Sequence, residues 1–462
     1  MENFWDYSVW GTVSLAAVLL CSLLFASFLR RRIPFLRNSL IPTSVLGGVL
    51  IVIVASVYKA VTGDVLFDTA FFGGNGTAEL EMITYHCLAL GFIASAFKPS
   101  KGKLTRKRTT EIFNTGVTTV STYLLQGIVG MAISIIAAFL ISGFFPAAGA
   151  LLPFGYGQGT GQAMNYGNIY EAEFGFSGGK SFGLVIAAFG FISASIGGVI
   201  HLNVLKHSGK IRTEQPAPAD ETAPTTPAPL RESIDRLTVQ IALIFVAYLL
   251  AYLLMWGLGT LLPGMKSVIF GFNFLLGVLT ATLIKLLLRA IGRKRRRNTE
   301  ATDAFLMTRA SNFFFDLMIV AGIAAIRFHT IDRYWGVMIL MGVVGLLVTF
   351  VYNRIVAKLL FPEYAEEQFL AMYGMLTGTA STGIILLREI DGDFVTPASD
   401  NLVYQNFPAI ALGFPMMLLA TFAPKQPVLS LVIFLVLFCV MNLLLFRSFL
   451  FKKRKKEDRA DS

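Results

Sequence analysis

The feature that most limits the fold of this chain is a series of long apolar runs separated by short polar loops. A helix needs about 20 apolar residues to cross the hydrocarbon core of a bilayer. Because only helices and closed barrels satisfy the backbone within lipid, such runs predict an all-α polytopic membrane protein. The predicted spans are Val9–Leu29, Ile41–Tyr58, Met82–Phe97, Phe113–Ser142, Ser181–Leu205, Leu237–Leu262, Val268–Leu288, Phe305–Ile326, Trp335–Leu360, Phe407–Phe422 and Val428–Phe451.

The composition excludes a soluble protein of ordinary type. Of the 462 residues, 15% are charged and 55% are hydrophobic, whereas globular chains average about 25% charged residues. The net charge of +11 comes from short basic clusters between the apolar runs, which is typical of cytoplasmic membrane loops and gives no indication of nucleic-acid binding. Cys21, Cys87 and Cys439 lie in separate apolar runs, so no disulfide framework or metal site is predicted.

Two further segments, 153–176 and 369–394, are apolar only in part, because Gly, Ser, Thr, Gln and Asn interrupt them. The closely spaced glycines from Gly155 to Gly161 would each cost about 1 kcal/mol in a plain helix. We therefore predict broken helices that enter and leave the membrane on one face, as re-entrant hairpins. The alternative is a glycine-rich helix that lets a neighbouring helix pack closely.

The distribution of basic residues predicts the orientation of the chain. Arginines follow the first span at 30–32, and lysines and arginines follow the third at 98–108. The positive-inside rule places both loops in the cytoplasm, so the N-terminus lies outside and the C-terminus, with its basic tail 452–456, lies in the cytoplasm. Counting each interrupted segment as a re-entrant hairpin then gives the two halves of the chain opposite orientations.

This topology predicts an inverted repeat of five transmembrane helices plus one re-entrant hairpin each, with one extra C-terminal transmembrane helix. The first repeat covers 1–207 and the second covers 234–424. A disordered, Pro-rich cytoplasmic linker joins them at 208–233, and the extra helix and basic tail occupy 425–462. Inverted repeats with broken segments at matching positions are typical of secondary transporters.

The hairpins are the predicted substrate site, because irregular backbone at membrane depth persists only where it is buried or lines a watery cavity. There, free N–H groups can hold a carboxylate and carbonyls can hold sodium. Arg388, which follows the second hairpin, could bind a substrate carboxylate or instead pair with Glu389, Asp391 or a lipid phosphate. The predicted binding residues are Gln158, Gly159, Thr160, Gly161, Thr377, Gly378, Thr379, Ser381, Thr382 and Arg388.

Asp316 lies in the middle of an apolar run, close to Asn312. Ionisable groups inside a span are costly and tend to be functional. We predict that Asn312 and Asp316 hold the coupling sodium ion, with proton transfer or a structural pair with Tyr85 or His86 as alternatives for Asp316. A lone histidine such as His86 is more simply a hydrogen-bonded core residue.

No motif indicates an enzyme. The four histidines form no HExxH pattern, and neither a GxSxG motif nor a P-loop is present. An ATP-driven pump is thus disfavoured. The remaining alternatives are an exporter or a proton-coupled or exchange transporter of another organic anion, and a membrane receptor that signals through its linker or tail.

Three stretches resemble the bacterial sodium/glutamate symporter family: Ile41–Gly48, Gly157–Gly161, and Phe182–Gly198 with the following Lys206-His207-Ser208. The resemblance implies ten spans, two re-entrant hairpins and a homodimer in the plasma membrane. It also implies elevator-type symport of glutamate, or a similar small anionic carboxylate, with sodium as the co-transported ion and no other cofactor.

Overall fold

The computed structural model describes residues 3–98, 105–208, 235–294, 302–392 and 395–447. Within these ranges the chain is entirely helical and contains no strand. The prediction of an all-helical fold is therefore confirmed for this part. The predicted linker, apart from Ser208, and the basic tail lie outside the described residues.

Ten helices of the described part are long and apolar enough to cross a membrane. They are α1 (Tyr7–Arg32), α3 (Thr43–Thr62), α4 (Gly76–Phe97), α5 (Arg106–Leu140), α7 (Gly179–His207), α8 (Arg236–Leu261), α10 (Asn273–Lys294), α11 (Ala304–Ala324), α12 (Trp335–Leu360) and α17 (Pro427–Leu445). Short α15 (Ala398–Tyr404) and α16 (Asn406–Phe422) meet at a bend of 49° and pass the same test together.

Each predicted span coincides with one of these helices, with one correction. The run Val268–Leu288 is divided between α9 (Lys266–Gly271) and α10. The break falls at Phe272, directly after the glycine that ends α9. A hydropathy average over about 20 residues does not detect such a break, because Gly271 and Asn273 are single interruptions in an apolar run.

The first interrupted segment folds back on itself. Helix α6 (Leu151–Phe174) breaks at Gly159, whose φ of 80° and ψ of −172° are not helical. The rings of Phe154 and Tyr166 stack with centroids 3.7 Å apart, although 12 residues of straight helix would separate them by about 18 Å. The two limbs of α6 therefore lie side by side with the turn at Gly159.

The second interrupted segment also reverses, between α13 (Ala365–Thr377) and α14 (Ala380–Arg388). A Cβ atom built on Gly374 would lie 2.8 Å from the Cα atom of Gly383, so the two helices pack almost backbone to backbone. The turn falls at Gly378 and Thr379. Neither α6 nor the α13–α14 pair is among the candidate spans.

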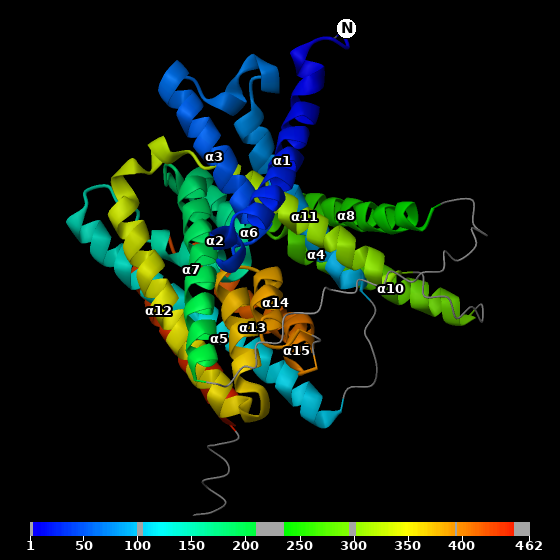
Figure 1. Cartoon of the computed structure of the whole chain (residues 1–462), viewed down its shortest axis with the longest axis vertical. Helices are drawn as coiled ribbons and strands as arrows, with labels where there is room; N and C mark the ends of the chain where they lie inside the picture. Colours follow the sequence, from blue (N-terminus) through cyan, green and yellow to red (C-terminus); the bar gives the residue numbers. More distant parts are fainter. Residues whose placement is uncertain (1–2, 99–104, 209–234, 295–301, 393–394, 448–462) are drawn as a thin grey trace, which may run out of the picture.

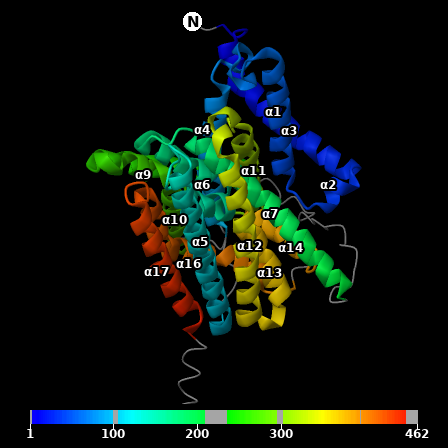
Figure 2. The same cartoon turned by 90° about the vertical axis from the view of Figure 1, so that its left-hand side faces the viewer.

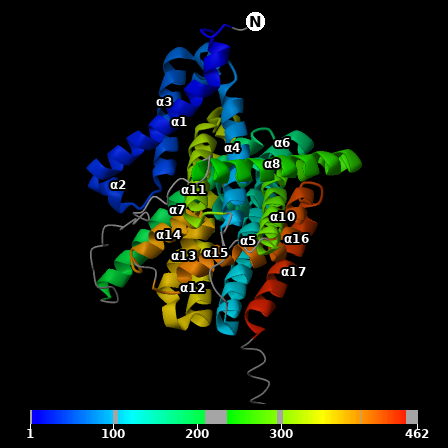
Figure 3. The ribbon, with the colours of Figure 1, turned by 90° about the vertical axis from the view of Figure 1, so that its right-hand side faces the viewer.

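The long helices pack in matching pairs from the two halves of the chain. Helix α4 packs on α11 and α5 packs on α12. Helix α3 packs on α11, and α10 packs on α4 in the corresponding way. Figure 1 shows α1 with α3 at one end of the molecule, and α8 with α10 projecting to one side. Figure 2 shows α17 alongside α5, and Figure 3 shows α8 crossing the direction of α5.

Polar contacts fix both hairpins to their neighbours. Arg354 of α12 binds Glu366 at the start of α13 with two hydrogen bonds of 2.5 and 2.6 Å, and His201 of α7 lies 2.8 Å from the same carboxylate. In α6, the hydroxyls of Tyr166 and Tyr170 donate to backbone carbonyls of α16 at 2.9 and 2.6 Å. The hairpins are thus parts of the folded core.

The contact between α6 and α7 generates a stability prediction. A Cβ atom on Gly167 would collide with the Gly179 carbonyl and lie 2.8 Å from the Cα atom of Lys180. We expect Gly167→Ala to lower the free energy of unfolding by about 1–3 kcal/mol, because the helices must separate. Thermal unfolding of the purified protein measures the effect.

The matched control is Gly257→Ala in α8, where nothing lies within 4 Å of the added methyl group. This variant should unfold at or above the wild-type temperature, since alanine favours the helix over glycine. Equal midpoints for Gly167→Ala and the wild type would contradict the close packing of α6 on α7.

Candidate functional site

The tips of the two hairpins meet. A Cβ atom on Gly159 would lie 3.4 Å from the Cγ2 atom of Thr379 and 3.9 Å from the carbonyl oxygen of Gly378. The φ of Gly159 lies in the left-handed region that favours glycine. The broken segments of the two halves thus form one structure, as expected if they build a common site.

Side chains of α5 satisfy backbone carbonyls near both breaks. The Tyr123 hydroxyl donates to the Gly157 carbonyl at 3.0 Å, and the Gln126 amide donates to the Leu376 carbonyl at 2.9 Å. Both side chains point from adjacent turns of one helix. Helix α5 therefore replaces hydrogen bonds that a continuous helix would have supplied from its own backbone.

A cavity of about 190 Å³ adjoins the tips. Its walls come from the tips, from α4, α5, α10 and α11, and from α13 to α16. Apolar side chains such as Phe92, Phe274 and Met417 form much of the surface. The polar and charged side chains that line it are Ser95, Lys98, Tyr123, Gln158, Ser311, Asn312, Thr379 and Asn406.

The structure brings four of the predicted residues to this cavity: Gln158, Gly378, Thr379 and Asn312.

The other predicted residues of the two tips do not line the cavity. Thr160 is fully buried, with its hydroxyl 3.5 Å from the Met318 carbonyl. Gly161 packs against Leu88 and Met318. Thr377 donates to the Tyr373 carbonyl, and the Thr382 hydroxyl lies 3.4 Å from that of Thr379. The side chain of Ser381 lies outside the described part.

Arg388 does not lie among the residues that line the cavity. It ends α14, at the opposite end of this helix from the tip, and its side chain is exposed. Nine residues of helix separate it from Thr379 by about 13 Å. Arg388 was predicted to belong to the site because it is close to the hairpin in sequence. Helix α14 runs away from the tip, so its last residue, Arg388, lies away from the cavity.

Asn312 and Asp316 lie one turn apart on the same side of α11, and both are exposed in the single chain. Asn312 reaches the cavity, whereas Asp316 lies beside the buried hydroxyl of Ser44 at the start of α3. The alternative pairing of Asp316 is not formed. Tyr85 donates to the Phe270 carbonyl at 2.7 Å, and His86 Nδ1 lies 2.7 Å from the Tyr248 hydroxyl.

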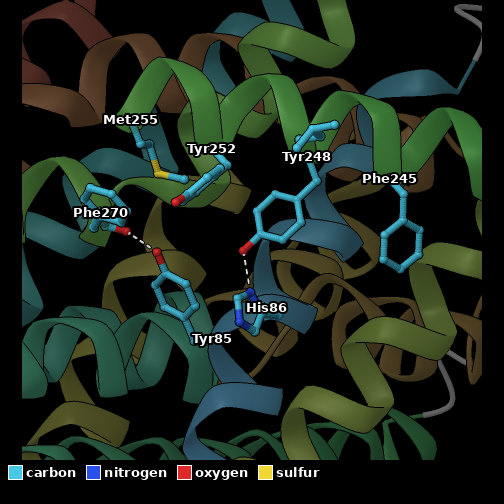
Figure 4. Close-up of a pocket in the computed structure, with 8 residues that line it drawn as sticks. Tyr85, His86, Phe245, Tyr248, Tyr252, Met255 and Phe270 are labelled. Atoms are coloured by element: carbon cyan, nitrogen blue, oxygen red, sulfur yellow. Dashed lines mark hydrogen bonds between the residues drawn. The ribbon is translucent and has the colours of Figure 1, made fainter. Parts of the chain in front are cut away.

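A second pocket, of about 390 Å³, lies between α4 and α8. Figure 4 shows Tyr248 directed at His86, and Tyr85 directed at the backbone of Phe270. Its walls are largely aromatic, and they include Tyr85 and His86, the two residues considered above as partners of Asp316. His86 is hydrogen-bonded as expected, but it is exposed rather than part of the core.

Sequence analysis missed Lys98, Ser95 and Asn406 as cavity residues. Lys98 begins a basic cluster and was assigned to a cytoplasmic loop by charge alone. Ser95 stands within an apolar run and Asn406 directly before one, and no local pattern distinguishes either residue. The spacing of Phe92, Ser95 and Lys98 does place them on one face of a helix, but which face meets the hairpins depends on tertiary packing.

The hydrogen bond from Gln126 generates a second prediction. Gln126→Leu should lower the free energy of unfolding by about 1–3 kcal/mol, because the buried Leu376 carbonyl loses its side-chain donor. Denaturation of the purified variant measures the loss. Gln426→Leu, at an exposed position that makes no side-chain cap, should leave stability nearly unchanged. Equal stability of the two variants would contradict the role of Gln126.

Comparison with known proteins agrees with this architecture. A family model described as sodium/glutamate symporter matches residues 9–371. This range includes the first hairpin, Asn312 and Asp316, and ends within α13, before the second tip. A comparison with curated proteins found no match. Because the family model matches more than half of the length of this chain, the chain belongs to the sodium/glutamate symporter family.

Proposed function

We propose that this protein is a sodium-coupled symporter of glutamate or a similar small acidic amino acid or carboxylate, with the substrate held at the two hairpin tips. The contact between Gly159 and Thr379, beside a cavity whose largely apolar wall carries a few polar groups, supports this proposal. Two broken segments from different halves of the chain adjoin the same cavity, as in transporters whose discontinuous helices bind substrate near the bilayer midplane.

The tips supply suitable groups for a carboxylate. Helix α14 begins at Ala380, and its N-cap Thr379 makes no side-chain cap bond. The first N–H groups of a helix lack intrahelical partners and carry partial positive charge, so they attract anions. The Gln158 amide and the Thr379 hydroxyl add polar contacts at the cavity wall. Substitution of Gln158 or Thr379 should therefore change the affinity for substrate.

The finer architecture forms part of the proposal. Residues 1–207 and 234–424 are two inverted repeats, each with a re-entrant hairpin, and the extra helix α17 lies outside the repeat. In the proposed repeat, α3 corresponds to α10 and α4 corresponds to α11. The packing of α3 on α11 then has its counterpart in the packing of α10 on α4, which supports this arrangement. The protein works as a plasma-membrane homodimer by an elevator motion, with its N-terminus outside and its C-terminus in the cytoplasm.

The decisive experiment is uptake of labelled glutamate into proteoliposomes that contain the purified protein, with and without an inward sodium gradient. A membrane potential of 100 mV alone contributes about 2.3 kcal/mol for each sodium ion that enters. We expect sodium-dependent uptake that unlabelled acidic amino acids reduce. Uptake that follows a proton gradient, or exchange with another organic anion, would replace this proposal with the corresponding alternative.

The role of the second tip is tested by Thr379→Leu. The bulky apolar side chain should displace substrate from the cavity and remove a polar contact, so the apparent affinity should fall by roughly tenfold or more. Thr110→Leu, on the exposed face of α5, is the control and should transport as the wild type does. Unchanged affinity in Thr379→Leu would place the substrate elsewhere.

Sodium coupling is assigned to Asn312 and Asp316, with the alternative that Asp316 carries a proton. Asp316→Asn removes the charge but keeps the shape of the side chain. We expect this variant to fold and to need a sodium concentration at least roughly tenfold higher for half-maximal uptake, since carboxylate oxygens are ligands for hard cations. Asp332→Asn, at an exposed site, is the control. Unaltered sodium dependence in Asp316→Asn would exclude the assignment.

A further inference from the structure

The cavity at the hairpin tips has an unbalanced positive charge. Among the described residues that line it, Lys98 is the one charged residue, and none is acidic. We propose that the Lys98 ammonium holds the side-chain carboxylate of the substrate and so makes the transporter prefer acidic amino acids over their amides. This inference rests on the proposed function and adds a residue that selects the substrate.

Lys98 is placed at the cavity by the direction of α4. It directly follows Phe97, the last residue of the helix, and lies on the same face as Phe92 and Ser95, which also line the cavity. Leu88, on an earlier turn, packs against Gly161 in the first tip. Helix α4 therefore contacts the first tip at Leu88 and lines the cavity further along, at Phe92, Ser95 and Lys98.

A second lysine meets the usual need for positive charge at this helix end. Unpaired carbonyls at a helix C-terminus attract cations. Here the Lys285 ammonium of α10 donates to the carbonyl of Ala96 at 2.9 Å and also to that of Lys98. The backbone of Lys98 is therefore fixed by Lys285. Capping of α4 thus does not explain why a second cation stands at this position.

The environment of Lys98 favours an anionic ligand. Its side chain is partly buried, and burial lowers the pKa of its ammonium group. Removing a cation from water is unfavourable unless an opposite charge compensates it. The cavity walls supply serine, threonine, asparagine and glutamine groups but no carboxylate within the described lining. A substrate carboxylate would provide the missing negative charge.

Two carboxylates suit the two ends of the cavity. The backbone at the tips can accept the carboxylate that every amino acid carries, as proposed above. Lys98, nearer the end of α4, can then bind the carboxylate of an acidic side chain. The amide of glutamine has the same shape but no charge, so it would leave the ammonium uncompensated.

The test compares glutamate and glutamine binding by calorimetry on the purified full-length protein in lipid nanodiscs with saturating sodium. We expect Lys98→Gln to weaken glutamate binding by roughly 10- to 100-fold, as for loss of a charge-assisted hydrogen bond. Glutamine binding should change less than about threefold. The preference for glutamate would thus largely disappear, whereas Lys98→Arg should keep most of it.

Lys107→Gln is the matched control, because it removes the same charge from an exposed lysine that pairs with Glu363 at 2.8 Å. It should bind both ligands as the wild type does. An equal loss of glutamate and glutamine affinity in Lys98→Gln would show a structural role and overturn the inference, as would unchanged glutamate binding. A wild-type protein that binds neither ligand would instead overturn the proposed function, and the inference with it.

Discussion

The arrangement of this protein depends on the requirement that backbone N–H and C=O groups have hydrogen-bond partners when they leave water. In the part of the chain that the structure describes, ten helices meet it by remaining continuous. The segments at Gly159 and Gly378 do not, and carbonyls near each break bind Tyr123 or Gln126 of α5 instead. A single helix thus supports both tips, which explains why they can meet beside a cavity without separating the surrounding bundle.

Much of the fold could be predicted from the sequence because each span is a local property of about 20 residues. The broken segments were equally visible, since glycine and polar residues interrupt apolar runs only at a cost. The break at Phe272 was not predicted, because only Gly271 and Asn273 interrupt an otherwise apolar run there. The inverted repeat, the hairpins' relation to the membrane and the homodimer stay predictions.

Site residues could be predicted only where the sequence around them already indicates a special role. Gln158, Gly378, Thr379 and Asn312 line the cavity as their positions suggested, although their contacts with substrate stay a prediction. The predicted arginine does not line this cavity, for a geometric reason. Arg388 follows the second tip closely in sequence but lies at the far end of α14, whereas Lys98 arrives from α4 in the other half of the chain. Such a meeting depends on helix direction, which no short motif encodes.

The contact between the tips divides the site between the two halves. Gly159 belongs to the segment before the linker, and Thr379 belongs to the segment after it. A protein cut in the loop between α7 and α8 would therefore leave one tip on each fragment, and neither fragment alone would enclose the cavity. Enclosure of the cavity is thus a joint property of the two halves of the chain.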